Sequence, residues 1–254
     1  MRNKSDRIYA ILTATIDPSV YNNVNSVLTD VEERLKQYKE SFRRYIEESE
    51  FTDIVVAENS EYPFDKKYYE DLAEQHGKRF EYLDCPRHIE ETIAYRKSYG
   101  ESTLITDALN MSQLLAETST IYKLTGRVFL KNSYSIVKAM KKHKNEFLVM
   151  DKYSWCYTHV FKFNKQDYYD VFQHADKRIM ESKVNIEHNY YKLIVKNFDR
   201  LDIGCFRVWP YVLGHHGTTG ASYTNSFKGR IYHDLLCMCN AYTHGSKLGH
   251  LLKM

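Results

Sequence analysis

Three hydrogen-bonding side chains, Lys123, Thr125 and Arg127, recur at alternate positions of segment 121–130, whose other residues are typical of a strand. Alternate strand positions share a face, so these three groups face one way and Gly126 faces the other. Burying them without partners would be costly. Two interpretations follow. The segment is an edge strand with a hydrated face, or this face is the floor of a phosphate or sugar site, with Gly126 letting a ligand approach the backbone.

Two other segments could contribute to such a site. The apolar run 51–59 ends in Glu-Asn-Ser, and side chains at the carboxyl end of a parallel strand can contact a ligand or simply form a turn. Arg96 and Lys97 precede Gly100, after which a helix is predicted. Free N–H groups at a helix start attract phosphate, and nearby cations add to this, although solvated basic residues before a capped helix look the same. Neither a Walker sequence nor GxGxxG is present.

Strand and helix patterns alternate along most of the chain, which predicts an α/β fold with a mostly parallel sheet flanked by helices. The predicted strands are 8–16, 51–59, 79–85, 121–130, 146–151 and 156–164. The predicted helices between them are 29–49, 65–78, 98–119 and 133–145. The remainder is predicted as a helical stretch 165–200, an extended segment 205–214, a polar loop 215–226 and a helix 228–254. We therefore divide the chain into a domain of residues 1–227 and a C-terminal helical tail of residues 228–254.

The composition limits the class of protein. A chain of 254 residues fits one large α/β domain or two small ones. Its net charge of +3 permits an anionic ligand, but no nucleic-acid partner is expected because no concentrated basic face is evident. The 5 cysteines form no CxxC pair, which favours a reducing cytoplasm over a disulfide or zinc framework. The 22 tyrosines suit sugar or nucleotide binding, or reflect genome composition.

Several segments of the chain also resemble those of a known family. The ordered segments AENS, KSYGESTLITDAL, YKLTGRVFLKN, THVFKFN, NIEHNYY and GHHGTTGASY resemble those of bacterial cell-surface glycosyltransferases, over roughly residues 8–225. In that family a similar strand segment follows a loop and helix containing GE. The resemblance implies a Rossmann-like, GT-A-type fold with a C-terminal helical elaboration. It also implies sugar transfer from a nucleotide sugar to a capsule, O-antigen or lipooligosaccharide glycan, free or lipid-linked.

The donor site that the resemblance implies lacks one expected motif. Many GT-A enzymes hold a divalent metal with a DxD sequence after the fourth strand, and here YKLTGR stands in that place. This implies a metal-independent enzyme without a cofactor, in which Lys123 and Arg127 offset the diphosphate charge. The implied donor-binding residues are Asn59, Glu61, Lys97, Gly100, Glu101, Lys123, Thr125, Gly126 and Arg127.

An inverting transferase needs a carboxylate to deprotonate the acceptor hydroxyl. The resemblance favours Glu187, in segment 184–191, as this base, with Asp151 as the second choice; alternatively Glu187 is an ordinary solvated helix residue. The loop 214–223 could bind phosphate or gate the acceptor, or could be a plain surface loop. Four residues are predicted on the acceptor side: His188, His215, His216 and Thr218.

Other interpretations stay open. The chain could be a related nucleotidyl or phosphosugar transferase on the same frame, or a non-catalytic sugar-binding subunit. The basic amphipathic segment 228–254 could pack on the domain or rest on an anionic bilayer, where lipid-linked acceptors are found. In the second case the protein would be peripheral on the inner face of the cytoplasmic membrane.

Overall fold

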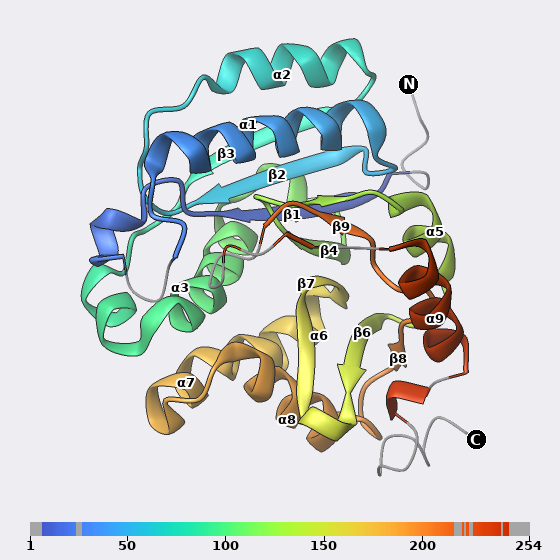
Figure 1. The fold of residues 1–254 in the computed structure, drawn as a ribbon. Coiled ribbons are helices and arrows are strands. Elements are labelled where there is room, and N and C mark those ends of the chain that lie inside the picture. The colour runs from blue at the N-terminus through green and yellow to red at the C-terminus, as the bar shows by residue number, and fades with distance from the viewer. Residues whose placement is uncertain are drawn as a thin grey trace.

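The computed structural model describes residues 7–23, 27–215, 220, 222–223, 226–239 and 241–243. Its main sheet contains the strands β1 (Tyr9–Ala14), β2 (Asp53–Glu58), β3 (Arg79–Asp84), β4 (Thr120–Thr125), β6 (Asn145–Met150), β7 (Trp155–Asn164) and β8 (Ile203–Cys205). They lie in the order β3-β2-β1-β4-β7-β6-β8 (Figure 1). The neighbours from β3 to β4 are parallel, β7 is antiparallel to both of its neighbours, and β8 is parallel to β6. The predicted α/β class with a mostly parallel sheet is confirmed.

Helices cover both faces of this sheet (Figure 1). One face packs against α1 (Val31–Glu48), α2 (Lys66–Gln75) and α5 (Ser133–Ala139). The other packs against α3 (Ile89–Met111), α4 (Gln113–Ala116), α6 (Lys165–Asp170), α7 (Ala175–Ser182) and α8 (Ile186–Asn197). The short 3-10 helices are η2 (Pro18–Tyr21), η3 (Asp151–Tyr153), η4 (Phe172–His174) and η5 (Ala241–Thr243). The sequences of β1 and β2 are mostly apolar, as expected for parallel strands that are covered on both faces.

The predicted strand 121–130 is two elements. β4 ends at Thr125, and β5 (Phe129–Leu130) leaves the main sheet to pair with β9 (Val212–Leu213). Gly126 forms the junction: a Cβ there would lie 2.8 Å from the carbonyl oxygen of Thr13, so this position must be glycine because of a backbone contact within the fold. Arg127 therefore lies beyond the strand instead of on its face. Because β4 lies between β1 and β7, the edge-strand interpretation is wrong.

The helix predicted to begin after a loop at Gly100 begins at Ile89 instead. Gly100 lies within α3, where a Cβ would come 3.2 Å from the side chain of Thr92, so glycine allows close packing and forms no turn. The helix is interrupted at Arg96, whose φ of 68° and ψ of −178° are non-helical. Lys97 consequently begins a second helical segment. The helix start that the sequence suggested near the site exists, but it lies before Gly100.

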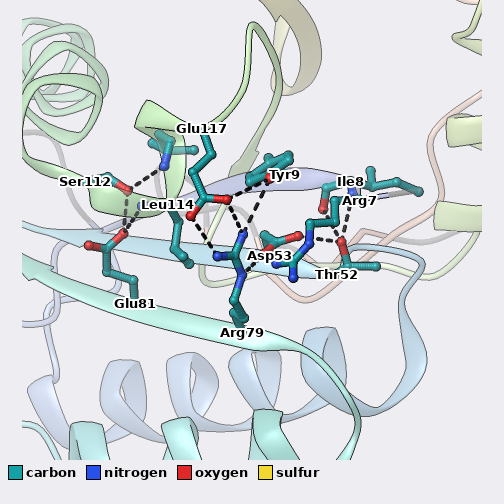
Figure 2. Close-up of polar contacts among 11 residues, drawn as sticks. Arg7, Ile8, Tyr9, Thr52, Asp53, Arg79, Glu81, Ser112, Leu114 and Glu117 are labelled. Atoms are coloured by element: carbon teal, nitrogen blue, oxygen red, sulfur yellow. Dashed lines mark hydrogen bonds and ion pairs between the residues drawn. The ribbon is translucent and has the colours of Figure 1, made fainter. Parts of the chain in front are cut away.

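A charged network ties the amino ends of the strands together, at the opposite end of the sheet from their carboxyl edge (Figure 2). Asp53, the first residue of β2, is fully buried and accepts hydrogen bonds from Arg7, at 2.9 Å, and from Arg79. Arg79 also donates to both carboxylate oxygens of Glu117, at 2.8 and 3.1 Å. The pairing avoids the cost of leaving the buried carboxylate of Asp53 uncompensated.

The predicted helix 228–254 is confirmed only as far as Met238, where α9 (Phe227–Met238) ends; Cys239 is a turn, and η5 follows as a separate 3-10 helix. Residues 240 and 244–254 of the predicted helix lie outside the described residues. Ser226 caps α9 by accepting a hydrogen bond from the N–H of Gly229. Among the helices that the structure describes, none combines the length and the apolar character that crossing a membrane requires.

Candidate active site

A cavity of about 170 Å³ opens at the carboxyl edge of β1, β2 and β4, under α3. We call it the edge cavity. Six of the predicted donor-binding residues line it: Asn59, Lys97, Gly100, Glu101, Thr125 and Arg127. They come from three segments of the chain, the ends of β2 and β4 and the helix α3, and the strand ends lie together because the carboxyl ends of parallel strands meet at one edge of the sheet.

Arg127 is a fixed cation in the wall of the edge cavity. The residue is 6% exposed, and its guanidinium donates to Oε1 of Gln37, at 2.6 Å, and to the carbonyl oxygen of His215, at 2.8 Å. Burial lowers the pKa of Arg127, but arginine remains charged in proteins. His215, predicted on the acceptor side, thus holds Arg127 through its backbone, while its ring Nδ1 lies 3.2 Å from the carbonyl oxygen of Gly220.

Hydrogen-bond donors in the same cavity are left for a ligand. Thr15 donates to Oδ1 of Asn59 at 2.7 Å, which turns the Asn59 amide nitrogen toward Gly100. No described residue accepts from this nitrogen. The hydroxyl of Thr92, a residue only 4% exposed, also has no hydrogen-bond partner among the described residues. Buried polar groups without partners in a cavity wall indicate that something polar binds there.

Lys123 lies behind the cavity wall. Its side chain is fully buried, and its ammonium donates to the carboxylate of Glu101 and, at 2.9 Å, to the carbonyl oxygen of Thr158. Burial raises the pKa of Glu101, but the adjacent ammonium more than reverses this, so the net pKa is lowered and Glu101 stays ionised. The predicted contact between Lys123 and a diphosphate therefore needs correction: Lys123 instead holds Glu101 in the wall.

Two further predicted donor residues lie outside the edge cavity. Glu61 pairs with Arg87 at the surface, and Gly126 is enclosed by the carbonyl oxygen of Thr13 and the side chains of Leu12 and Phe42. Two predicted acceptor residues, His216 and Thr218, lie outside the described residues.

A second cavity, of about 650 Å³, adjoins the first. We call it the aromatic cavity, because Trp155, Tyr157 and Trp209 line it. Lys97 lines both cavities. Among the described residues Lys97 forms no hydrogen bond or ion pair, so its ammonium is available to a ligand at the junction.

A hydrogen-bonded chain also joins the two cavities. Thr125, in the wall of the edge cavity, lies with its hydroxyl 3.3 Å from Nδ1 of His159. Nε2 of His159 lies 2.5 Å from the hydroxyl of Tyr223, and both of these residues line the aromatic cavity. The two cavities are therefore parts of one site.

The structure separates the two predicted bases. Glu187, in the first turn of α8, lines the aromatic cavity, and burial together with the Glu101 charge raises its pKa. Asp151 lines neither cavity: Oδ1 accepts from the hydroxyl of Tyr191 at 3.0 Å, and Oδ2 is buried without a partner. His188 packs edge-on against Trp155, with Nδ1 2.6 Å from the carbonyl oxygen of Ser154. Only Glu187 places its carboxylate where a ligand could reach it.

Several residues that line the two cavities were not predicted from the sequence: Arg34, His159, Trp155, Tyr157, Trp209 and Tyr223. A signal was present for two of them, because Trp155 and Trp209 are the only tryptophans of the chain. Among the described residues, no group of three or more His, Cys, Asp or Glu residues could hold a metal ion.

Comparisons with known proteins concern the fold. Neither a protein-family model nor a curated protein sequence matches the chain. Solved structures do align with it. The glycosyltransferase GlyE of Streptococcus pneumoniae aligns at 6% identity and a TM-score of 0.49, over 79% of this chain and 45% of GlyE, so this chain spans less than half of GlyE. The galactosyltransferase LgtC, in complex with donor and acceptor sugar analogs, aligns at 8% identity and a TM-score of 0.47, over 79% of this chain and 74% of LgtC.

A third structure belongs to another class of enzyme. A nucleoside-diphosphate-sugar pyrophosphorylase from Vibrio cholerae aligns at 16% identity and a TM-score of 0.43, over 78% of this chain and 91% of that one. All three similarities concern the path of the backbone. The chemistry has to come from the two cavities.

Proposed function

We propose that the protein is a glycosyltransferase that moves a sugar from a nucleotide sugar in the edge cavity to a hydroxyl of a glycan in the aromatic cavity. The observation that carries this proposal is the pair of adjoining cavities, which share Lys97. One offers cations and hydrogen-bond donors at the carboxyl edge of parallel strands. The other offers the half-buried carboxylate of Glu187. Transfer between two bound molecules needs such an arrangement, and the motif resemblance to cell-surface glycosyltransferases agrees with it.

The donor diphosphate would lie between Arg127 and Lys97. Arg127 is held in place by Gln37 and His215, so it is already oriented before a ligand arrives. Lys97 begins the second segment of α3, where backbone N–H groups add positive potential. Asn59 would hydrogen-bond the nucleotide or the sugar. These two cations, instead of Lys123 and Arg127, would offset the phosphate charge, so we expect no divalent metal to be needed.

In the transfer step, Glu187 accepts the proton of the acceptor hydroxyl as that oxygen bonds to the anomeric carbon of the donor sugar. The bond from this carbon to the phosphate oxygen breaks, and its electron pair leaves with the nucleoside diphosphate. Arg127 and Lys97 stabilise the negative charge that develops on the leaving group. Glu101, held ionised by Lys123, keeps its charge throughout.

We expect purified protein to release nucleoside diphosphate from at least one nucleotide sugar, and to do so equally in EDTA. Nucleotide release would be measured over a panel of UDP-, GDP-, CDP- and dTDP-sugars. Arg127→Met should reduce release at least about tenfold, the effect of losing one charge-assisted contact. Arg43→Met, at a surface arginine of α1 paired with Glu40, is the matched control and should not change the rate.

Three other outcomes would contradict parts of the proposed function. Loss of activity in EDTA with recovery in Mn²⁺ would contradict metal independence. Formation of nucleotide sugar from nucleoside triphosphate and sugar phosphate would identify a nucleotidyltransferase, and donor binding without turnover would identify a non-catalytic subunit.

We also propose that α9 brings the protein to anionic membranes, where a lipid-linked acceptor would be found. Ile231, Leu235 and Met238 share one face of α9 and are 47, 54 and 62% exposed. The single acidic residue of α9, Asp234, is turned inward to the backbone N–H of Trp209 and the hydroxyl of Tyr211. An apolar face without exposed acidic groups suits an anionic bilayer surface.

This contact can be tested by sedimentation with vesicles of phosphatidylglycerol and phosphatidylcholine. We expect the full chain to sediment with the anionic vesicles and Leu235→Glu to remain in the supernatant. Tyr134→Glu, at a residue of α5 that is 61% exposed, should sediment like the unmodified chain. Equal sedimentation of all three would argue that α9 does not contact the membrane.

A further inference from the structure

The aromatic cavity has a wall of ordered rings. Trp209 stacks on His233, with ring centroids 4.3 Å apart and an interplanar angle of 20°. The backbone N–H of Trp209 is fixed by Asp234 at 2.9 Å. Tyr157 packs against Trp209 at 6.0 Å. These contacts hold the rings in place without a ligand, which lowers the entropy lost on binding.

The rings are not fully buried by the protein. Trp155, Tyr157 and Trp209 are each partly exposed, and all three face the same hollow. Exposed aromatic surface that converges in a concave site is typical of a binding site for a ligand with an apolar face. The chain contains two tryptophans, and both line this cavity.

Polar groups share the cavity with the rings. They are Ser98, Thr158, His159, Asn185, Glu187 and Ser222. An acyl chain would cover the carboxylate of Glu187 with hydrocarbon, at a cost in free energy. A hexopyranose matches both sets, because its C–H groups form an apolar face and its hydroxyls point outward to donors and acceptors. One cation and one carboxylate, Lys97 and Glu187, line the cavity together, so a neutral sugar suits it better than a charged one.

We propose that the aromatic cavity binds a neutral hexopyranose unit, with the apolar face of the sugar against Trp209 and Trp155. The volume of about 650 Å³ falls within the range of roughly 300–1,000 Å³ of small-molecule sites, so a short oligosaccharide fits. That this sugar is the acceptor rests on the proposed function, and its hydroxyl would then lie beside Glu187. The binding of the sugar itself does not depend on that function.

The location of both tryptophans provides the test, because their intrinsic fluorescence reports on this cavity. The full chain would be titrated with methyl hexopyranosides of different configuration and with a neutral disaccharide, and with glycerol as the control. We expect a saturable change in tryptophan emission for at least one sugar and none for glycerol. Trp155→Phe leaves Trp209 as the single reporter and should retain the change.

Substitution of Trp209 completes the test. Trp209→Ala should weaken sugar binding about tenfold by calorimetry, and Trp209→Phe, which keeps a ring, should weaken it less. Tyr153→Ala, at a ring that is 61% exposed outside the cavity, should bind like the unmodified chain. Unfolding curves would confirm that each variant is folded.

The outcomes separate this inference from the proposed function. Sugar binding without nucleotide release would support the sugar site and contradict the proposed transferase activity. Nucleotide release with no fluorescence response to any sugar, and with an unchanged acceptor KM in Trp209→Ala, would overturn the sugar site alone. A full fluorescence response to free nucleotides that Trp209→Ala abolishes would also overturn it, because the rings would then stack on a base.

Discussion

Glu187→Gln is expected to lower the rate of sugar transfer by about 10²–10⁴-fold, the usual contribution of a positioned general base. Nucleotide binding should not change, because Glu187 lines the aromatic cavity and not the edge cavity. Glutamine keeps the size and one carbonyl oxygen of the side chain, so the fold should be retained. The measurements are kcat with the working donor and nucleotide affinity by calorimetry.

The pH dependence gives a second readout of the same residue. A general base works in its deprotonated form, so the rate should rise with pH through the pKa of Glu187. Burial raises the pKa of Glu187, and the nearby negative charge of Glu101 raises it further, so this acid limb should lie above the ordinary glutamate pKa of 4.5. The limb should disappear in Glu187→Gln.

Two variants serve as controls for this assignment. Glu181→Gln changes an exposed glutamate of α7 and should have no effect on kcat or on the acid limb. Asp151→Asn tests the second predicted base, whose carboxylate bonds Tyr191 outside both cavities. If Asp151→Asn removed activity while Glu187→Gln did not, the base would be Asp151.

Much of the edge cavity could be predicted from the sequence because it depends on a general rule. Strand periodicity identified the parallel strands, and the carboxyl ends of such strands meet at one edge. Asn59 follows directly from that rule, whereas Thr125 and Arg127 were predicted on the face of a longer strand and reach the edge because β4 ends at Thr125. The position of Lys97 in the cavity wall needed only a helix start nearby, so the error in where the helix begins did not matter.

The aromatic cavity could not be predicted, because no periodic pattern marks it. Trp209 lies in an extended segment between β8 and β9, and it reaches the site only because α9 packs behind it through His233 and Asp234. Trp155 begins β7, an antiparallel strand inserted between β4 and β6. Sequence spacing carries no information on such long-range packing.

The error over Lys123 has a similar cause. Periodicity correctly placed Lys123 and Thr125 on one face of β4, but it could not show what covers that face. In the structure α3 lies over it and supplies Glu101 as a partner. A polar residue on a central strand can therefore mean a buried ion pair as readily as a ligand site, and the two meanings predict different behaviour on mutation.

Lys123→Met is expected to lower the free energy of unfolding by about 3–5 kcal/mol, because it leaves the carboxylate of Glu101 without its partner. The ammonium of Lys123 is fully buried and Glu101 is 26% exposed, so water can replace only part of the lost interaction. The double variant Lys123→Met/Glu101→Gln removes both charges and should recover part of this loss. Urea unfolding of the three proteins measures it.

Acid should weaken the same pair. Because Lys123 lowers the pKa of Glu101, the pair contributes stability above the ordinary glutamate pKa of 4.5 and loses it as the pH falls through the lowered pKa. In Lys123→Met this acid-dependent contribution should be absent. Stability measured between neutral and acidic pH would therefore converge for the two proteins as Glu101 becomes protonated.

Lys97→Met is the matched comparison, since it removes a lysine that lines both cavities, is exposed and has no ion pair among the described residues. It should leave the free energy of unfolding unchanged and weaken nucleoside diphosphate binding. The opposite pattern would restore the original hypothesis: if Lys123→Met kept its stability and lost nucleotide binding, Lys123 would contact the diphosphate directly. Comparing the two variants thus distinguishes ligand binding, expected of Lys97, from support of the cavity wall, expected of Lys123.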